Sequence, residues 1–339
     1  MKRPLLANYY ITTRCNARCV FCSIRRKSGM DAHSADVLRH LKDLSSLGVR
    51  IVDMTGGEPL LHPDLPLFLR EAKRRGLKTT VTTNGILYPA RAEEIRGLVD
   101  WLHFSLDSID AAEHDRIRGV RCFDRVMESL AVAQRLGEDP DILFTVTPEN
   151  HVRLEEMIDL ARQAGRMLIL NPVFSYFGNL PLDKEGLDRL RAASSLPFVY
   201  VNRAMIRFMK QGGNHTSHPR CRAVSTTVVL MPDNTVLWPC FHRPVRKMPL
   251  TTGLRDTAIQ SARERWIKRE GRLPMCEGCS VSCYFDPSFV LGMDDYFLLS
   301  QISKVKYLWD KHVRSGFRRK IRCPKDPGRR TEDFPPRTG

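Results

Sequence analysis

The stretch Cys15-Asn16-Ala17-Arg18-Cys19-Val20-Phe21-Cys22 decides how the rest of this chain of 339 residues is interpreted. It spaces three cysteines as C-x3-C-x2-C, and thiolates this close together form a soft sulfur site suited to an iron–sulfur cluster. A [4Fe-4S] cubane here would keep one iron without a protein thiolate, and that iron could hold a substrate or cofactor. A zinc knuckle or scattered structural thiols are the alternatives. Zinc prefers four ligands in paired C-x2-C units, and this stretch offers no fourth.

Phe21, an aromatic residue directly before the third cysteine, completes a pattern that resembles the radical S-adenosylmethionine (SAM) superfamily. The resemblance implies that Cys15, Cys19 and Cys22 hold a [4Fe-4S] cluster whose open iron chelates the amino and carboxylate groups of SAM. It also implies that one electron, supplied by a donor such as flavodoxin or ferredoxin, breaks the sulfonium bond. The product is a 5′-deoxyadenosyl radical, which takes a hydrogen atom from the substrate.

The first half of the chain alternates short apolar runs with amphipathic runs that stop at a glycine, which predicts a parallel α/β sheet. Periodicity alone allows either a barrel or a doubly wound sheet. The family resemblance favours a partial (β/α)6 barrel, open on one side, over residues 1–200. The expected strands are Leu6–Thr12, Arg50–Met54, Lys78–Thr82, Trp101–Leu106, Ile142–Val146 and Met167–Leu170.

Glycines and polar residues follow these strands at their carboxyl ends, where parallel α/β sheets bind ligands. Gly56-Gly57-Glu58-Pro59 comes after the second expected strand, and its glycines let the backbone approach a ligand without a Cβ in the way. Alone the tetrapeptide is only a turn signal. One βα unit after the cysteines, it resembles the family motif that holds the SAM ammonium, so we assign that role to Gly56, Gly57 and Glu58.

Further SAM contacts are expected from Phe21, Asn84, Ser105, Asp107 and Arg118. Ser105 and Asp107 suit a ribose diol or the polar groups of SAM, although they could simply cap the next helix. Asn84 precedes a glycine and is above all a turn residue. Arg118 could pair with the SAM carboxylate or be an ordinary solvated helix arginine.

Five more cysteines lie between Pro197, where the alternating pattern ends, and residue 290. Residues 226–231 and 235–238 predict a β-hairpin, and Cys276-Glu277-Gly278-Cys279 forms a chelating knuckle. Residues 201–290 therefore resemble the small α+β auxiliary-cluster extension of many radical SAM enzymes, called SPASM with two clusters and twitch with one. Five thiols favour a single second [4Fe-4S] cluster, with a tetrahedral zinc site as the alternative. The preferred ligands are Cys221, Cys240, Cys276 and Cys279, with Cys283 spare or replacing one of them.

The net charge of the chain is +16, and residues 304–339 contribute half of it, with twelve Lys and Arg against four Asp and Glu. Apolar residues at helical spacing begin at Tyr296 and continue to Trp309. Within residues 291–339 we expect a C-terminal helix that docks on the core, followed by a basic tail. The second interpretation is a basic amphipathic helix on an anionic membrane surface. Familiar RNA-binding motifs are absent from the sequence, so nucleic acid is not an expected partner.

Composition is ordinary for a folded protein, and the N-terminus has no signal-peptide core. We expect a cytoplasmic enzyme, peripheral to the inner face of the membrane if the second interpretation of the tail holds. The expected function is radical SAM chemistry on a small-molecule or lipid-like substrate, with the auxiliary cluster as an electron conduit. A peptide-modifying maturase is the alternative within the class. A non-catalytic iron–sulfur carrier or sensor is the alternative outside it. Cys122 and Cys323 are expected to be ordinary thiols.

Overall fold

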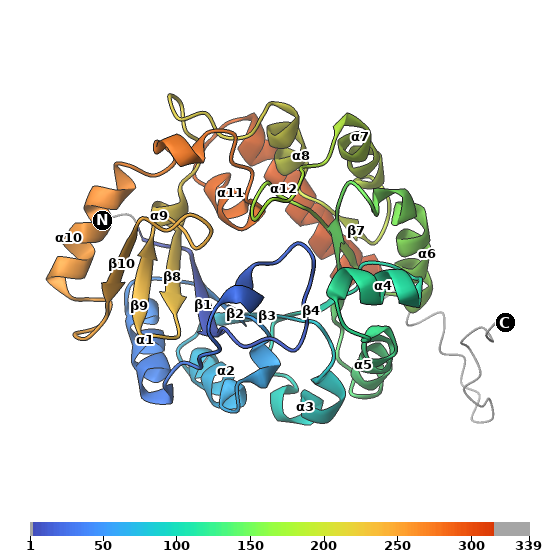
Figure 1. Ribbon diagram of the computed structural model, residues 1–339, viewed down its shortest axis with the longest axis horizontal. Coiled ribbons are helices and arrows are strands. Elements are labelled where there is room, and N and C mark those ends of the chain that lie inside the picture. Colours follow the sequence, from blue (N-terminus) through green and yellow to red (C-terminus); the bar gives the residue numbers. More distant parts are fainter. Residues whose placement is uncertain (1–2, 315–339) are drawn as a thin grey trace.

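The computed structural model of the chain describes residues 3–314 (Figure 1). Ten strands form one sheet in the order β10-β9-β8-β1-β2-β3-β4-β5-β6-β7, and the strands from β8 through β1 to β7 are parallel. The sheet curls into a partial barrel, and the six predicted strands are confirmed with ends shifted by at most two residues. The strands of the barrel are β1 (Leu6–Thr12), β2 (Ile51–Gly56), β3 (Lys78–Thr83), β4 (Trp101–Ser105), β5 (Asp141–Val146), β6 (Leu168–Pro172) and a short β7 (Val199–Tyr200).

Helices cover the convex face of this sheet, and the main core lies between the two layers (Figure 1). Because side chains alternate along a strand, Val52 and Met54 of β2 are fully buried under the helices, while Asp53 and Thr55 face the concave interior. The helices of the barrel are α1 (Ser34–Ser46), α2 (Leu65–Arg74), α3 (Tyr88–Ile95), α4 (Ala111–Arg118), α5 (Phe123–Arg135), α6 (Leu154–Ala164) and α7 (Lys184–Ala193).

The predicted hairpin is confirmed as β8 (Thr227–Met231) and β9 (Thr235–Trp238), with Asn234 in the left-handed region at φ 56°. An unpredicted strand, β10 (Arg246–Pro249), follows. β8 pairs in parallel with β1, Leu6 opposite Thr227, so the hairpin widens the barrel sheet at its open edge. The sheet is therefore continuous across the boundary that we predicted at residue 200, and the division into domains stays a prediction.

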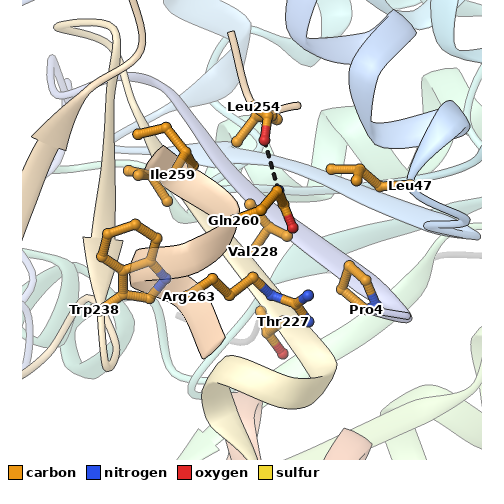
Figure 2. Close-up of a pocket in the computed structure, with 10 residues that line it drawn as sticks. Pro4, Leu47, Thr227, Val228, Trp238, Leu254, Ile259, Gln260 and Arg263 are labelled. Carbon is orange, nitrogen blue, oxygen red and sulfur yellow. Dashed lines mark hydrogen bonds between the residues drawn. The ribbon is translucent and has the colours of Figure 1, made fainter. Parts of the chain in front are cut away.

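The remaining helices are α8 (Arg203–Lys210), α9 (Ala223–Thr226), α10 (Thr257–Ile267), α11 (Ser282–Ser288) and α12 (Asp295–Leu308), which continues into a π-helical turn over Trp309–Arg314. Of these, α8, α9, α11 and α12 lie on the open side of the barrel between β8 and β7, whereas α10 lies at the outer edge beside β9 (Figure 1). α10 packs over β8 and β9 around a small cavity that Leu254, Ile259 and Trp238 help to line, and Gln260 Nε2 donates to the Leu254 carbonyl at 2.6 Å (Figure 2).

α12 docks on the core, as predicted, through apolar and polar side chains together. Tyr296 is buried in an apolar cluster against which Leu299 packs, and Ser300 and Ser303 are buried as well. Val305 and Trp309 are exposed instead, which the apolar spacing alone did not predict because it does not register polar partners from distant segments. Among residues 3–314 no helix is both long and apolar enough to cross a bilayer. Cys323 and most of the basic tail lie outside the described residues.

Candidate functional site

The cysteine stretch forms a loop at the carboxyl end of β1, pressed against the two glycines after β2. A Cβ on Gly56 would lie 2.1 Å from the Thr12 carbonyl oxygen, and one on Gly57 would lie 2.0 Å from that of Arg14. The amides of Gly57 and Glu58 donate to these same two carbonyls at 3.0 and 2.8 Å. The glycines thus allow close approach to the cysteine loop. Both of these amides are already bonded, so they are not available to a ligand. An ammonium group needs acceptors, and the acceptors that this turn offers are its carbonyls.

Glu58 joins the ends of β2 and β3. Its side chain is buried and accepts hydrogen bonds from Thr83 Oγ1 at 2.8 Å, from the Asn84 amide at 2.8 Å and from the Leu60 amide at 3.0 Å. Burial raises the pKa of the carboxyl group, and these three donors oppose the rise. The geometry makes Glu58 a positioning residue for the turn, and a direct contact with SAM stays a prediction.

Asp107 and Arg118, which the sequence suggested as separate SAM contacts, form one buried ion pair. Arg118 Nη2 lies 2.7 Å from Asp107 Oδ2, and the second carboxylate oxygen accepts the Thr145 amide at 3.0 Å. Arg118 is therefore no solvated helix arginine. Burial lowers the pKa of Arg118, but the Asp107 and Cys19 charges outweigh it, so the net shift is upward. This keeps a fixed positive charge at the rim.

The same arginine reaches the cysteine loop. Its Nη1 lies 3.6 Å from Cys19 Sγ, and its guanidinium lies 5.6 Å from the centre of the Phe21 ring. The Arg118 carbonyl accepts the Arg18 amide at 2.8 Å. The end of α4 thus holds the loop by backbone and side chain together, and it places a cation beside the Cys19 sulfur.

Three half-buried thiols in one loop, with a cation beside one of them, fit a cluster that needs three thiolates and leaves one iron open. Burial raises the pKa of Cys15 to about 12, and the neighbouring charges of Glu58, Cys19 and Cys22 act in the same direction. A thiol with so high a pKa is a poor nucleophile by itself, but metal binding removes its proton. The donor set therefore fits an iron–sulfur cluster better than a free reactive cysteine.

Asn84 and Ser105 complete the rim. Asn84 Nδ2 donates to Asn16 Oδ1, inside the cysteine loop, at 2.7 Å. Ser105, the last residue of β4, is buried, and no group among the described residues hydrogen-bonds its hydroxyl. Of the predicted SAM contacts, Ser105 is the one whose polar group the protein leaves without a bond, while Glu58, Asn84, Asp107 and Arg118 hold the rim together.

The four preferred cysteines of the second set line one small apolar cavity. They come from segments far apart in sequence: Cys221 precedes α9, Cys240 follows β9, and Cys276 and Cys279 flank a glycine turn before α11. Cys283 is not on the wall of this cavity. Its Sγ lies 3.6 Å from His242 Nε2 instead. Four thiols around one cavity fit a closed four-ligand centre, either a cluster or zinc.

Asn214, which no sequence signal singled out, ties the segments of this second set together. Its side chain is fully buried, and Nδ2 donates to the carbonyls of Gly271 and Cys276 at 2.8 and 3.1 Å. Oδ1 accepts the amides of Arg220 and Cys221 at 3.1 and 3.3 Å. Its backbone amide donates to the Cys279 carbonyl at 3.0 Å. One asparagine thus sets the relative position of three cysteines.

Two buried side chains fix the helical turn that follows Cys221. Glu270 accepts the amides of Val224 and Ser225 at 3.0 and 2.8 Å, and Arg263 of α10 donates to their two carbonyls. Gly271 lies so close that a Cβ there would be 2.9 Å from Cys221 Cβ.

A buried group of mostly aromatic and aliphatic side chains separates the two thiol sites. Tyr10 of β1 stacks on Phe241 with ring centres 4.0 Å apart. The Tyr284 hydroxyl accepts a hydrogen bond from the Phe241 amide at 2.8 Å. Both Cys22 and Cys283 pack against this group. The two sites are therefore linked through one packed cluster on the concave side of the barrel.

These features define a class: an enzyme fold of partial-barrel type with a thiol-rich metal site at the carboxyl ends of its strands. Residues 9–163 match the family model described as the Radical SAM superfamily. Residues 9–163 are thus a radical SAM domain, and the chain is an enzyme of the radical SAM class, a class that uses a [4Fe-4S] cluster and SAM. The alternative of a non-catalytic carrier or sensor is therefore wrong.

Relatives in this superfamily match mainly the barrel. The protein named Probable GTP 3′,8-cyclase of Sulfurisphaera tokodaii is 29% identical over 238 residues, covering 64% of this chain and 76% of that protein. The AdoMet-dependent heme synthase of Methanosarcina barkeri is 31% identical over 168 residues, 48% of each chain. This chain spans only about half of the length of several other relatives that it matches.

Solved structures share the fold over most of the chain. Streptococcus suis SuiB bound to S-adenosylmethionine superposes with a TM-score of 0.62 at 19% identity, covering 87% of this chain and 76% of SuiB. Native anSMEcpe with bound AdoMet and the Cp18Cys peptide gives a TM-score of 0.59 at 15% identity, covering 94% of this chain and 100% of that one. The shared fold therefore extends beyond the barrel into the segment that carries the second thiol set.

Proposed function

We propose that this radical SAM enzyme cleaves SAM reductively and takes a hydrogen atom from a small-molecule or lipid-like substrate, with a second [4Fe-4S] cluster as electron conduit. When bound, the first cluster supplies the electron that breaks the sulfonium bond, and the 5′-deoxyadenosyl radical that results becomes 5′-deoxyadenosine on taking the substrate hydrogen.

Each predicted residue has a part in this proposal. Cys15, Cys19 and Cys22 hold the first cluster, and carbonyls of Gly56 and Gly57 meet the SAM ammonium. Ser105 offers its unbonded hydroxyl to the ligand. Glu58, Asn84 and the Asp107–Arg118 pair keep these groups in register. The second cluster is held by the remaining set, Cys221, Cys240, Cys276 and Cys279.

One observation supports electron transfer by the second cluster. Side chains of both thiol sets pack against the same buried group of side chains around Tyr10 and Phe241. A closed four-thiolate centre cannot bind substrate at a metal vertex, so its use would be electron transfer or bracing of the fold. The short, packed separation supports the first role, because an electron leaving a substrate radical in the barrel would have a nearby acceptor.

The test is 5′-deoxyadenosine formed from SAM by the anaerobically reconstituted and reduced protein, together with its iron content. We expect 5′-deoxyadenosine, and about eight irons per chain for two cubanes. Cys22→Ala should abolish 5′-deoxyadenosine formation and halve the iron content. Cys279→Ala should lower the iron content to the same degree yet still cleave SAM. If the protein holds four irons and one zinc, the conduit is excluded while SAM cleavage stands.

Peptide maturation is a second candidate, because S. suis SuiB is also known in a structure bound to its precursor peptide SuiA, with a similar fold. That structure has a TM-score of 0.57 at 19% identity and covers 77% of this chain and 66% of that one. Under this candidate, adding a partner peptide would raise 5′-deoxyadenosine formation above the rate with SAM alone. A lipid extract or small-molecule pool would raise it under the first.

A flavodoxin or ferredoxin is the electron donor that we propose, because the basic surface of the chain would attract an acidic redox protein. Nucleic acid is not a proposed partner. We infer a reducing compartment, the cytoplasm, since nine described cysteines are free thiols and metal ligation by thiolates requires them to stay reduced.

A further inference from the structure

The outward face of α12 carries an apolar stripe that no other described segment covers. Its members recur at the i, i+4, i+7 and i+11 spacing of one helix face. They are Leu298, Ile302, Val305 and Trp309, exposed by 59, 44, 64 and 55% respectively. Isolated exposed apolar residues are normal on protein surfaces, but four on one stripe mark an interaction site.

Polar contacts on the opposite face fix this orientation. Lys306 Nζ donates to the carbonyls of Leu196 and Val199 at 2.7 and 2.8 Å, and Asp310 accepts the Phe198 amide at 3.1 Å. Farther along, Lys311 forms an ion pair with the buried Asp141 at the start of β5. Rotating the stripe inward would break all of these bonds, so the helix holds its apolar side chains toward solvent.

The charge that follows the stripe indicates what it meets. Residues 314–325 contain six Lys and Arg and no Asp or Glu, with Phe317 and Ile321 among them. We propose that α12 binds the surface of an anionic lipid bilayer, with the stripe inserted at the interface, because the positive charge of the sequence that follows is complementary to anionic headgroups. Stable attachment needs two such signals together, and the chain places them side by side.

A second copy of the chain is the competing occupant. A symmetric contact between two stripes would bring two copies of the same positive segment toward one interface, where like charges repel. An anionic membrane offers the complementary charge instead. The proposal rests on this helix and on the charge of the sequence after it, and not on the reaction assigned to the barrel, so each can fail without the other.

Co-sedimentation of the full chain with vesicles tests the proposal, using phosphatidylcholine alone or with phosphatidylglycerol added. We expect binding to the anionic vesicles, weakened by salt, and little to the neutral ones. Val305→Glu should reduce the partition coefficient by about tenfold or more, because it places a charge in the stripe. Val152→Glu is the matched control: Val152 is 54% exposed in the short 3-10 helix His151–Arg153, which is not part of the stripe, and the same change there should leave binding unaltered.

Emission of Trp309 gives a second measurement, since the fluorescence of an exposed tryptophan shifts to the blue on entering an interface. Deleting residues 315–339 should abolish the preference for anionic lipid. The proposal is overturned if the full chain fails to bind anionic vesicles, or if Val305→Glu binds as well as the unchanged protein. It is also overturned if the chain is a dimer that Val305→Glu dissociates, or if the deletion strengthens binding to neutral vesicles, which would mean that the tail covers the stripe.

Discussion

The first thiol site takes its three cysteines from one stretch of eight residues, whereas the second gathers four cysteines spread over residues 221–279. Around the first loop, supports arrive from the ends of β2, β3 and β4, with a buried ion pair among them. Around the second cavity, one neutral asparagine contacts three of the cysteine-bearing segments. The first site thus takes its ligands from one short segment and its supporting contacts from several strands. The second site takes its ligands from several segments, and a single asparagine contacts three of them.

This difference predicts how each site fails. Removing a support of the first site should destabilise the barrel rim but leave three thiols adjacent in the chain, so some metal is still held. Removing the asparagine of the second site should cost less in folding free energy and more in metal. The predictions below separate these two outcomes.

The largest effect on stability is expected from Arg118→Ala. It leaves the Asp107 carboxylate buried without its counter-charge, which costs about 3–5 kcal/mol of unfolding free energy. Anaerobic urea unfolding measures the loss. Arg116→Ala is the matched control on the same helix, because its pair with Glu149 at 3.4 Å is exposed and should contribute less than about 0.5 kcal/mol.

Asp107→Asn added to Arg118→Ala should restore part of this loss, since it removes the unpaired charge. If the double variant is no more stable than Arg118→Ala, the unpaired Asp107 charge is not the main cause of the lost unfolding free energy. Iron content of the single variant separates the sites further: the second set should keep its full share.

A smaller loss of stability and a larger loss of metal are expected from Asn214→Ala. Four backbone groups lose their partner, one in a buried and three in part-buried hydrogen bonds, at a cost of about 2–4 kcal/mol. Iron or zinc at the second site should fall well below that of the unchanged protein, while the spectroscopic signature of the first cluster and its response to SAM persist.

Asn84→Ala is the same substitution at the first site and serves as its control. Asn84 bonds only Asn16 and the Ile86 amide through its side chain, so the change should cost about 1 kcal/mol and release no metal from the second site. If Asn214→Ala and Asn84→Ala each lose equal amounts of metal from both sites, the proposed difference between the two sites is wrong.

The same contrast explains what the sequence could predict. The six barrel strands, the cysteine loop and the glycine turn follow from patterns a few residues long, and they hold in the structure. The pairing of Asp107 with Arg118, and the role of Asn214, depend on contacts between segments that only the fold brings together. α12 shows the limit most clearly, because its apolar spacing could not reveal which apolar residues pack inward and which ones the bonds from Lys306 to distant carbonyls leave exposed.

Asp53 tests the region of the barrel interior between the two sites. Its side chain faces this interior and has no hydrogen bond or ion pair among the described residues. Burial raises its pKa to about 7. Between pH 4 and 7 the unfolded chain has released this proton and the folded chain still holds it, so stability falls as pH rises through this range. Asp53→Asn removes that loss and should stabilise the protein at pH 8 by about 1–2 kcal/mol, allowing for solvent in the interior, with little change at pH 5.

Asp100→Asn gives the opposite sign and completes the test. Burial alone would raise the pKa of Asp100, but Lys73 at 2.8 Å and the Thr79 amide at 2.9 Å outweigh it and lower the value to about 2. Its ionised form therefore stabilises the fold above pH 4, and that stability is lost as pH falls toward 2. At pH 8 the two Asn variants should shift the urea midpoint in opposite directions. A destabilised Asp53→Asn at pH 8 would mean that the carboxylate has a partner in the folded enzyme, and a cation between the two thiol sites would then be the first to seek.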